Sequence, residues 1–224
     1  MAEDIELLGR IRSLRPDTPL IILTRETTPS DVLDSMRAHA FSLFSVPYRE
    51  DRLAEIIRYA VEMPCSDGDI ELISAFPERI QIHAGCQEST AIRLVHFVIE
   101  LTHLPPVERK RMGNAFREML MNAIEHGCQL DPGKRVEIKY IRYKRKIACR
   151  IADPGPGFNR NDVPHAAIGH PIDDPLAHIP IREQLGLRPG GFGIRMAKDL
   201  VDKLVYNKKG NEVLLVKYLK PEAT

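Results

Sequence analysis

An amphipathic helix near the middle of the chain sets the strongest constraint on its fold. Between Pro105 and Gly127, apolar residues recur at spacings of three and four, which predicts a helix that buries one stripe. Prolines suit the first turn of a helix, and a glycine suits the position just past its last turn. The apolar residues of this predicted stripe are Met112, Phe116, Met119, Leu120 and Ala123.

Two polar residues, Glu118 and Asn122, lie beside this stripe. They are four residues apart, so a helix points them in the same direction. A carboxylate can accept a proton or orient a nucleophile, and an amide can offer a neutral oxygen to a hard cation. The pair is therefore a candidate for catalysis and metal binding. The alternative is solvated helix surface, which is what most pairs of this kind are.

The composition of the 224-residue chain indicates a globular protein with one large domain or two small ones. Hydrophobic residues make up 43% and charged residues 28%, and a net charge of +1 gives no support for a nucleic-acid partner. No apolar run approaches the ~20 residues of a membrane span, and the N-terminus does not resemble a signal peptide. The four cysteines form no Cys-x-x-Cys pair, so we expect reduced thiols in a cytoplasmic protein, no zinc site, and a core position for Cys149.

Residues 1–63 are expected to form an α/β unit in which helices alternate with parallel strands. The run 19–24 is short and almost wholly apolar, which is typical of a strand buried on both faces. The predicted order is helix 5–14, strand 19–24, helix 31–38, strand 40–46 and a helix from Asp51.

This unit resembles the second half of a response-regulator receiver domain over residues 4–62. Residues 12–24 resemble that family's third helix and fourth strand, and residues 41–48 resemble its fifth strand. Val46 stands where the family has a lysine before a proline, and the half that carries the acidic pair and the phosphoacceptor aspartate is absent. The resemblance therefore implies a degenerate, partial receiver with a scaffold or dimerisation role. Because two strands are too few for a stable open sheet, we expect the unit to pack against the second domain or another copy of itself.

Residues 64–69 are predicted to form a linker, and residues 70–224 a second domain. Alternating apolar residues predict strands in this part, and a strongly apolar run predicts a helix. The predicted elements are strands 70–74 and 79–83, helix 91–101, hairpin 135–143 and 146–152, and strand 213–219.

Asp153 stands at the end of the second hairpin strand, where a turn of two prolines and two glycines begins. The glycines, Gly155 and Gly157, let the backbone of such a turn come close to a ligand. An aspartate at this position can accept a hydrogen bond from an exocyclic amine. The alternative is an ordinary turn after a strand.

Residues 159–188 show no helical or strand period and contain four prolines, which is typical of a lid or a disordered segment. The histidines of this segment have no recognised zinc spacing, so we expect no metal site there. Gly191 and Gly193 follow and lead directly into a predicted helix. Glycines at a helix N-terminus bring backbone N–H groups and a partial positive charge together, which suits a phosphate.

Three motifs in this order resemble the GHKL or Bergerat fold, the ATP-binding fold that gyrase B, the ninety-kilodalton heat-shock chaperones, histidine kinases and MutL share. The motifs are Glu-Met-Leu-Met-Asn-Ala-Ile-Glu-His-Gly, Asp-Pro-Gly-Pro-Gly-Phe and Gly-Gly-Phe-Gly, and the resemblance covers residues 68–222. Within that superfamily the chain looks most like the anti-sigma-factor serine kinases. The resemblance implies an α+β two-layer sandwich for residues 70–224.

The resemblance also implies a role for each motif residue. Asn122 would hold Mg²⁺ against the phosphates of ATP, Glu118 would be the general base, and Asp153 would bind the adenine amino group. The glycines that the resemblance implies for nucleotide binding are Gly155, Gly157, Gly191 and Gly193.

The function implied by this resemblance is that of an ATP-dependent serine/threonine protein kinase, with ATP and Mg²⁺ as its cofactors. The implied partners are an anti-sigma-factor antagonist, a sigma factor, or both; a second copy of the chain is a further candidate, and neither nucleic acid nor membrane is expected. Two alternatives stay open: a non-catalytic, nucleotide-gated binding switch, and the ATPase module of a histidine kinase. The presence of Glu118 favours catalysis.

Overall fold

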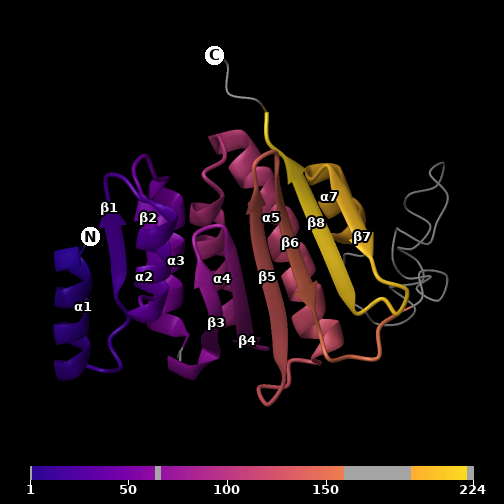
Figure 1. The fold of residues 1–224 in the computed structure, drawn as a ribbon. Coiled ribbons are helices and arrows are strands. Elements are labelled where there is room, and N and C mark those ends of the chain that lie inside the picture. Colours follow the sequence, from indigo (N-terminus) through magenta and orange to yellow (C-terminus); the bar gives the residue numbers. More distant parts are fainter. Residues whose placement is uncertain (1, 64–66, 159–192, 221–224) are drawn as a thin grey trace.

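A six-stranded antiparallel sheet organises the larger part of the molecule (Figure 1). The computed structural model describes residues 2–63, 67–158 and 193–220. Within these ranges the strand order of the sheet is β3-β4-β5-β6-β8-β7, and every neighbouring pair is antiparallel. The strands are β3 (Ile70–Phe76), β4 (Arg79–Gly85), β5 (Arg135–Tyr143), β6 (Lys146–Ala152), β7 (Lys203–Tyr206) and β8 (Glu212–Tyr218).

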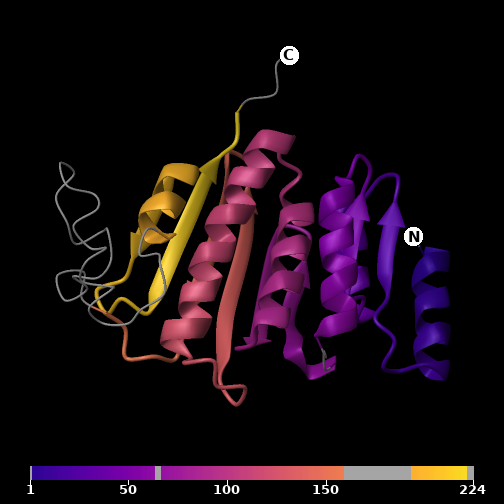
Figure 2. The ribbon, with the colours of Figure 1, turned by 180° about the vertical axis from the view of Figure 1, so that it is seen from behind.

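Among the described residues, three helices cover one face of this sheet (Figure 2). They are α4 (Glu88–Thr102), α5 (Pro106–Asn122) and α7 (Gly193–Leu200). The α+β two-layer architecture expected for this part of the chain is therefore confirmed. Among the described residues, no helix combines the length and the apolar character that crossing a membrane requires.

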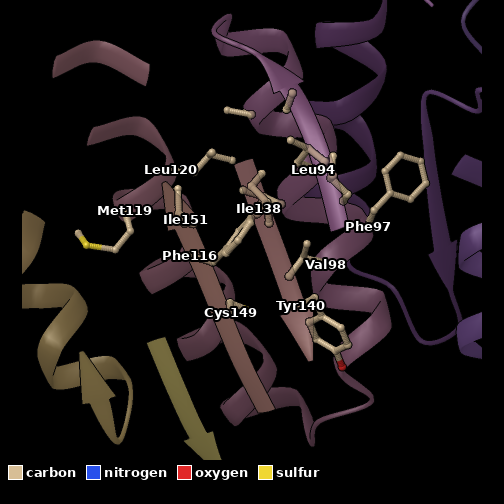
Figure 3. Close-up of a cluster of buried hydrophobic side chains, with 14 of the residues drawn as sticks. Leu94, Phe97, Val98, Phe116, Met119, Leu120, Ile138, Tyr140, Cys149 and Ile151 are labelled. Atoms are coloured by element: carbon tan, nitrogen blue, oxygen red, sulfur yellow. The ribbon is translucent and has the colours of Figure 1, made fainter. Parts of the chain in front are cut away.

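Every second side chain of the central strands points toward the helices and belongs to the core. Ile82 pairs with Ile138, which pairs with Ile151, so one row of buried side chains crosses three strands. Phe116 and Leu120 of α5 reach toward this row (Figure 3), and all five side chains are at most 1% exposed. Full burial of each such side chain stabilises the fold by roughly 1.5–3 kcal/mol.

Helix α5 has the start and the buried stripe predicted from the sequence. It begins at Pro106, and its predicted apolar positions are all buried. The α-helix ends at Asn122 and continues as one π-helical turn, η2 (Ala123–Gly127). In this turn the Cys128 N–H donates to the Ala123 carbonyl oxygen at 2.8 Å. Single π turns of this kind are frequent at functional sites.

The first 63 residues form the predicted alternation of helices and parallel strands. Their elements are α1 (Ala2–Leu14), β1 (Ile21–Thr24), α2 (Pro29–Arg37), β2 (Ser42–Ser45) and α3 (Glu50–Glu62). One prediction for this unit is wrong, because β1 is not buried on both faces and its Leu23 is 51% exposed. β1 is an edge of a two-stranded sheet, which covers it less than a larger parallel sheet would.

This N-terminal unit packs against α4, as the small size of its sheet led us to expect. Phe44 of β2, Ile56 of α3 and Ile92 of α4 belong to one buried cluster. At the same junction, Ser45 Oγ donates a hydrogen bond of 2.5 Å to Glu100 Oε2 of α4. Helix α4 therefore lies between the N-terminal unit and α5 (Figures 1 and 2), and eleven of its 15 residues are buried.

Most elements predicted in the second part of the chain are found with ends shifted by one to three residues, and two differences are larger. Residues 67–69 of the predicted linker form a short 3-10 turn, η1 (Asp67–Asp69), and the rest of that linker lies outside the described residues. The predicted helix after Gly193 ends at Leu200, and the strand β7 that follows was missed, because Ala197, Val201 and Leu204 continue the four- and three-residue spacing of a helix. The division of the chain into two domains stays a prediction.

The prediction of reduced thiols is wrong for two of the four cysteines. Cys86 and Cys128 form a disulfide, with their Cα atoms 6.2 Å apart. The pairing of β4 with β5 brings these positions together although they are 42 residues apart, and no local pattern reports this. Cys149 is free and lies in the core as predicted, where burial raises the pKa of its thiol to about 12. Cys65 lies outside the described residues.

His96 of α4 lies at the junction with the N-terminal unit. Its ring packs against Phe44, with 5.1 Å between the ring centres. Burial lowers the pKa of His96 to about 4; the charges of Arg52 and Arg117 lower it too, while Glu55 opposes them. The folded protein therefore favours the neutral imidazole.

We expect acid to destabilise the protein through His96. Its folded pKa lies below the unfolded value of about 6.5, so stability that is present above pH 6.5 is lost as the pH falls toward 4. Between pH 8 and pH 5 this residue accounts for a loss of about 2 kcal/mol in the free energy of unfolding. Urea unfolding of the wild type and of His96→Gln at pH 8 and pH 5 measures this contribution. The fall in the free energy of unfolding between the two pH values should be about 2 kcal/mol smaller in the variant. The same pH dependence in both proteins would contradict the prediction.

Candidate functional site

Three chain segments converge on Asp153, the residue that follows β6. Its backbone N–H donates to the Asn211 carbonyl oxygen, and its own carbonyl oxygen accepts from Asn211 Nδ2, both at 3.0 Å. Its side-chain Oδ1 accepts the Gly155 N–H at 2.9 Å. The turn thus engages one carboxylate oxygen, and Oδ2 is the oxygen that can accept from a ligand.

The surroundings of Asp153 are less polar than water. Burial raises the pKa of its carboxyl group, while the hydrogen bond from the Gly155 N–H and the positive charge of Lys209 lower it. A partly buried carboxylate forms stronger hydrogen bonds than one in bulk solvent, because the local dielectric is lower. Asp153 is therefore suited to select a ligand that carries a donor group.

The π turn after α5 packs directly on Asp153. A Cβ atom placed on Gly127 would lie 2.2 Å from Asp153 Cγ, far inside van der Waals contact. Only a residue without a side chain permits this approach. The helix that carries Glu118 and Asn122 is thereby joined, through its last turn, to the strand end that carries Asp153.

Glu118 and Asn122 meet the first residue of α7. A Cβ atom placed on Gly193 would lie 2.8 Å from Glu118 Oε2 and 4.0 Å from Asn122 Nδ2. All three residues are partly buried. The structure thus brings these predicted site residues together, while the predicted Gly191 lies outside the described residues.

The turn between β7 and β8 borders the site, and the sequence analysis assigned it no role there. Gly157 has a φ of +77°, and a Cβ atom on it would lie 2.0 Å from the Lys209 carbonyl oxygen. Asn207 Oδ1 accepts the Gly210 N–H at 2.7 Å, a bond between a side chain and the backbone that holds this turn. An asparagine three residues before a glycine is the signal that could have drawn attention to this turn and hence to Asn211.

Together these residues offer three kinds of chemistry. Asp153 can accept from an amine, Glu118 can accept a proton, and the Asn122 amide can give a neutral oxygen to a cation. Within the described ranges, no group of three or more His, Cys, Asp or Glu side chains could hold a metal ion. A cation that binds with few protein ligands and keeps most of its waters, as Mg²⁺ does, fits this donor set.

Comparison with protein families gives a match to residues 84–217. The matching family is described as the histidine kinase-like ATPase domain, and the match runs from the end of β4 into β8. All of the site residues named above fall inside it. The N-terminal unit falls outside it, so the resemblance of that unit to a receiver domain stays a prediction.

Three similar proteins carry the name serine-protein kinase RsbW. They come from Bacillus thuringiensis (strain Al Hakam), Bacillus cereus (strain 03BB102) and Bacillus anthracis (strain CDC 684 / NRRL 3495), and each is 25% identical to this chain over 109 residues. The alignment covers 48% of this chain and 62% of each relative. The chain thus spans less than two thirds of the length of these relatives.

We expect Gly157→Ala to destabilise the protein by at least about 2 kcal/mol, because an added Cβ meets a positive φ and the backbone of Lys209 at once. Gly9→Ala is the matched control, since a Cβ at Gly9 in α1 would meet nothing within 4 Å. That control should be neutral or should stabilise the helix by up to about 1 kcal/mol. Chemical unfolding of both variants measures the difference, and equal effects would contradict the assigned turn geometry.

Proposed function

Because the chain belongs to the histidine kinase-like ATPase family, we propose that it binds ATP with Mg²⁺ and transfers the γ-phosphoryl group to a serine or threonine of a partner protein. The observation that carries this proposal is the approach of Gly193 to Glu118 and Asn122. A carboxylate, which can accept a proton, and an amide, which can bind a cation, thus lie beside the first residue of α7. Asp153 lies against the last turn of the same helical segment, where it can select the base of the nucleotide.

In this proposal Asp153 recognises adenine. The exocyclic amine of adenine is a hydrogen-bond donor, and Asp153 Oδ2 is the acceptor that the turn leaves for it. Gly155 and Gly157 let this turn pack tightly against the backbone of Gly127 and Lys209, which fixes Asp153 at the place where we propose that the base binds. Recognition of the base thus needs one carboxylate and little side-chain bulk.

The proposed transfer relies on positioning and on charge. Glu118 accepts the proton of the attacking hydroxyl as its oxygen bonds to the γ-phosphorus and the bond from phosphorus to the ADP oxygen breaks. Asn122 would hold Mg²⁺, which when bound neutralises charge on the phosphates. Gly193, the first residue of α7, and Gly191, two positions before it in the sequence, would offer backbone N–H groups to phosphate oxygens.

The names of the similar proteins support serine as the acceptor residue. By the resemblance to anti-sigma-factor kinases, the proposed substrate is an anti-sigma-factor antagonist, and a sigma factor is a second proposed partner. A nucleotide-gated switch without phosphoryl transfer would not need a carboxylate at position 118. The position of Glu118 beside Gly193 therefore favours the kinase over the switch.

The first test is calorimetric titration of ATP and Mg²⁺ into the whole chain. We expect Asp153→Asn to weaken ATP binding at least about tenfold, because its amide oxygen stays with the Gly155 N–H and its NH₂ group then faces the adenine amine. Asp131→Asn is the matched control, since Asp131 also accepts a turn N–H, from Gly133, but lies outside the site. Equal affinity in the wild type and Asp153→Asn would refute the proposed role of Asp153.

The second test separates the kinase from the switch. We expect Glu118→Gln to bind ATP within a fewfold of the wild type and to transfer phosphate about 10²–10⁴ times more slowly, because a carboxamide cannot accept the proton. The measurement is transfer of label from γ-labelled ATP to a purified anti-sigma-factor antagonist, with the acceptor serine changed to alanine as the control. ATP binding without transfer by the wild type would instead support the switch.

A further inference from the structure

The six-stranded sheet has one face that no described element covers. Figure 1 looks onto this face, and α4, α5 and α7 lie behind it. The strand register places Tyr143 and Lys146 of the β5–β6 hairpin beside Tyr218 of β8 on this face. Lys203 of β7 lies on the same face, because it pairs with Val216 of β8, two residues before Tyr218.

At one end of this face the charged side chains are paired with one another. Arg150 bonds to both Glu137 and Glu212. Lys139 Nζ lies 3.3 Å from Glu137 Oε1, and Gln81 Nε2 donates to Glu137 Oε2 at 3.0 Å. This end, which is next to Asp153, needs no partner to balance its charge.

The opposite end, at the β5–β6 turn, is different. Lys144, Arg145, Lys146 and Lys203 are exposed, and none of them forms an ion pair with a described residue. Apolar surface lies among these cations. We call this area the hairpin face, and it consists of Tyr143, Lys144, Arg145, Lys146, Lys203, Val205 and Tyr218.

The aromatic rings of the hairpin face are only half covered. Tyr143 and Tyr218 are each 46% exposed, and Val205 is 53% exposed. Lys146 Nζ lies 4.9 Å from the centre of the Tyr143 ring, and Lys203 Nζ lies 5.7 Å from that of Tyr218. The ammonium groups thus lie over apolar surface, where a carboxylate that arrives with apolar side chains would be partly shielded from water.

We infer that the hairpin face is a docking surface for an acidic, amphipathic segment of a partner protein. Charge complementarity argues for this occupant, because unpaired cations surround exposed apolar side chains. A nucleic acid would need free ring faces for stacking, and lysines already occupy these rings. A second copy of the chain would offer the carboxylates of its own sheet face, Glu137 and Glu212. Both are already paired with Arg150, so they are poor partners for the cations of the hairpin face.

The test uses the whole chain and a fluorescent helical peptide of about 15 residues, long enough to cross four strands, with a leucine stripe flanked by glutamates. The same peptide with glutamine in place of glutamate is the comparison. Fluorescence anisotropy should show binding of the glutamate peptide that weakens several-fold between about 50 and 300 mM salt. The glutamine peptide should bind at least about tenfold more weakly.

Charge reversal at the turn, Lys144→Glu with Arg145→Glu and Lys146→Glu, should reduce affinity for the glutamate peptide at least about tenfold. Reversal of three exposed arginines of the N-terminal part, Arg10, Arg15 and Arg25, changes the net charge equally and is the matched control; it should change the affinity less than about twofold. Lys203→Glu, a single exposed change on another strand, tests the same surface if the triple variant fails to fold.

Three results would overturn the inference. The first is equal binding of both peptides, or binding that the reversals at the hairpin face do not change. The second is tighter binding of a single-stranded oligonucleotide than of the glutamate peptide. The third is a dimer, measured by sedimentation, that Lys203→Glu dissociates, because a second copy would then be the occupant of this face.

Discussion

Helix α5 buries Phe116 and Leu120 against the sheet, and the candidate site depends on this packing. Burial of the apolar stripe fixes the rotation of the helix about its own axis. This rotation in turn fixes the directions in which Glu118 and Asn122 point. The two polar residues need no dedicated contacts to be aimed at the start of α7. The position of the chemistry is therefore set by hydrophobic burial, which is large and non-directional, rather than by a few weaker polar bonds.

Asp153 is held by a different principle. Its strand ends at the edge of the core, and its backbone and side chain are then held by hydrogen bonds to Asn211 and Gly155 and by contact with the bare backbone of Gly127. Three segments that are distant in sequence must approach within van der Waals contact, and glycines make this possible. The Asp153 side of the candidate site is thus held in one geometry, because its turns cannot move independently.

Periodicity made most of the fold predictable, because it reports which face of each element is buried. It correctly placed α5, the β5–β6 hairpin and the parallel pair β1–β2. It could not report long-range pairing, so the Cys86–Cys128 disulfide and the contact of Asn211 with Asp153 were missed. It also mistook an edge strand for an interior one, since Leu23 is apolar but half exposed. The order of the three motifs, rather than any one of them, pointed to the site.

Helix α4 is buried on most sides because the N-terminal unit covers what the sheet leaves bare. Separation of the two parts would expose buried apolar side chains such as Phe44, Ile56 and Ile92 to water, so we expect the two parts to unfold as one cooperative unit. Binding of a ligand at the candidate site would then raise the stability of the first 63 residues by mass action, without any contact between the ligand and those residues. The candidate site and the N-terminal unit would in this sense be thermodynamically linked.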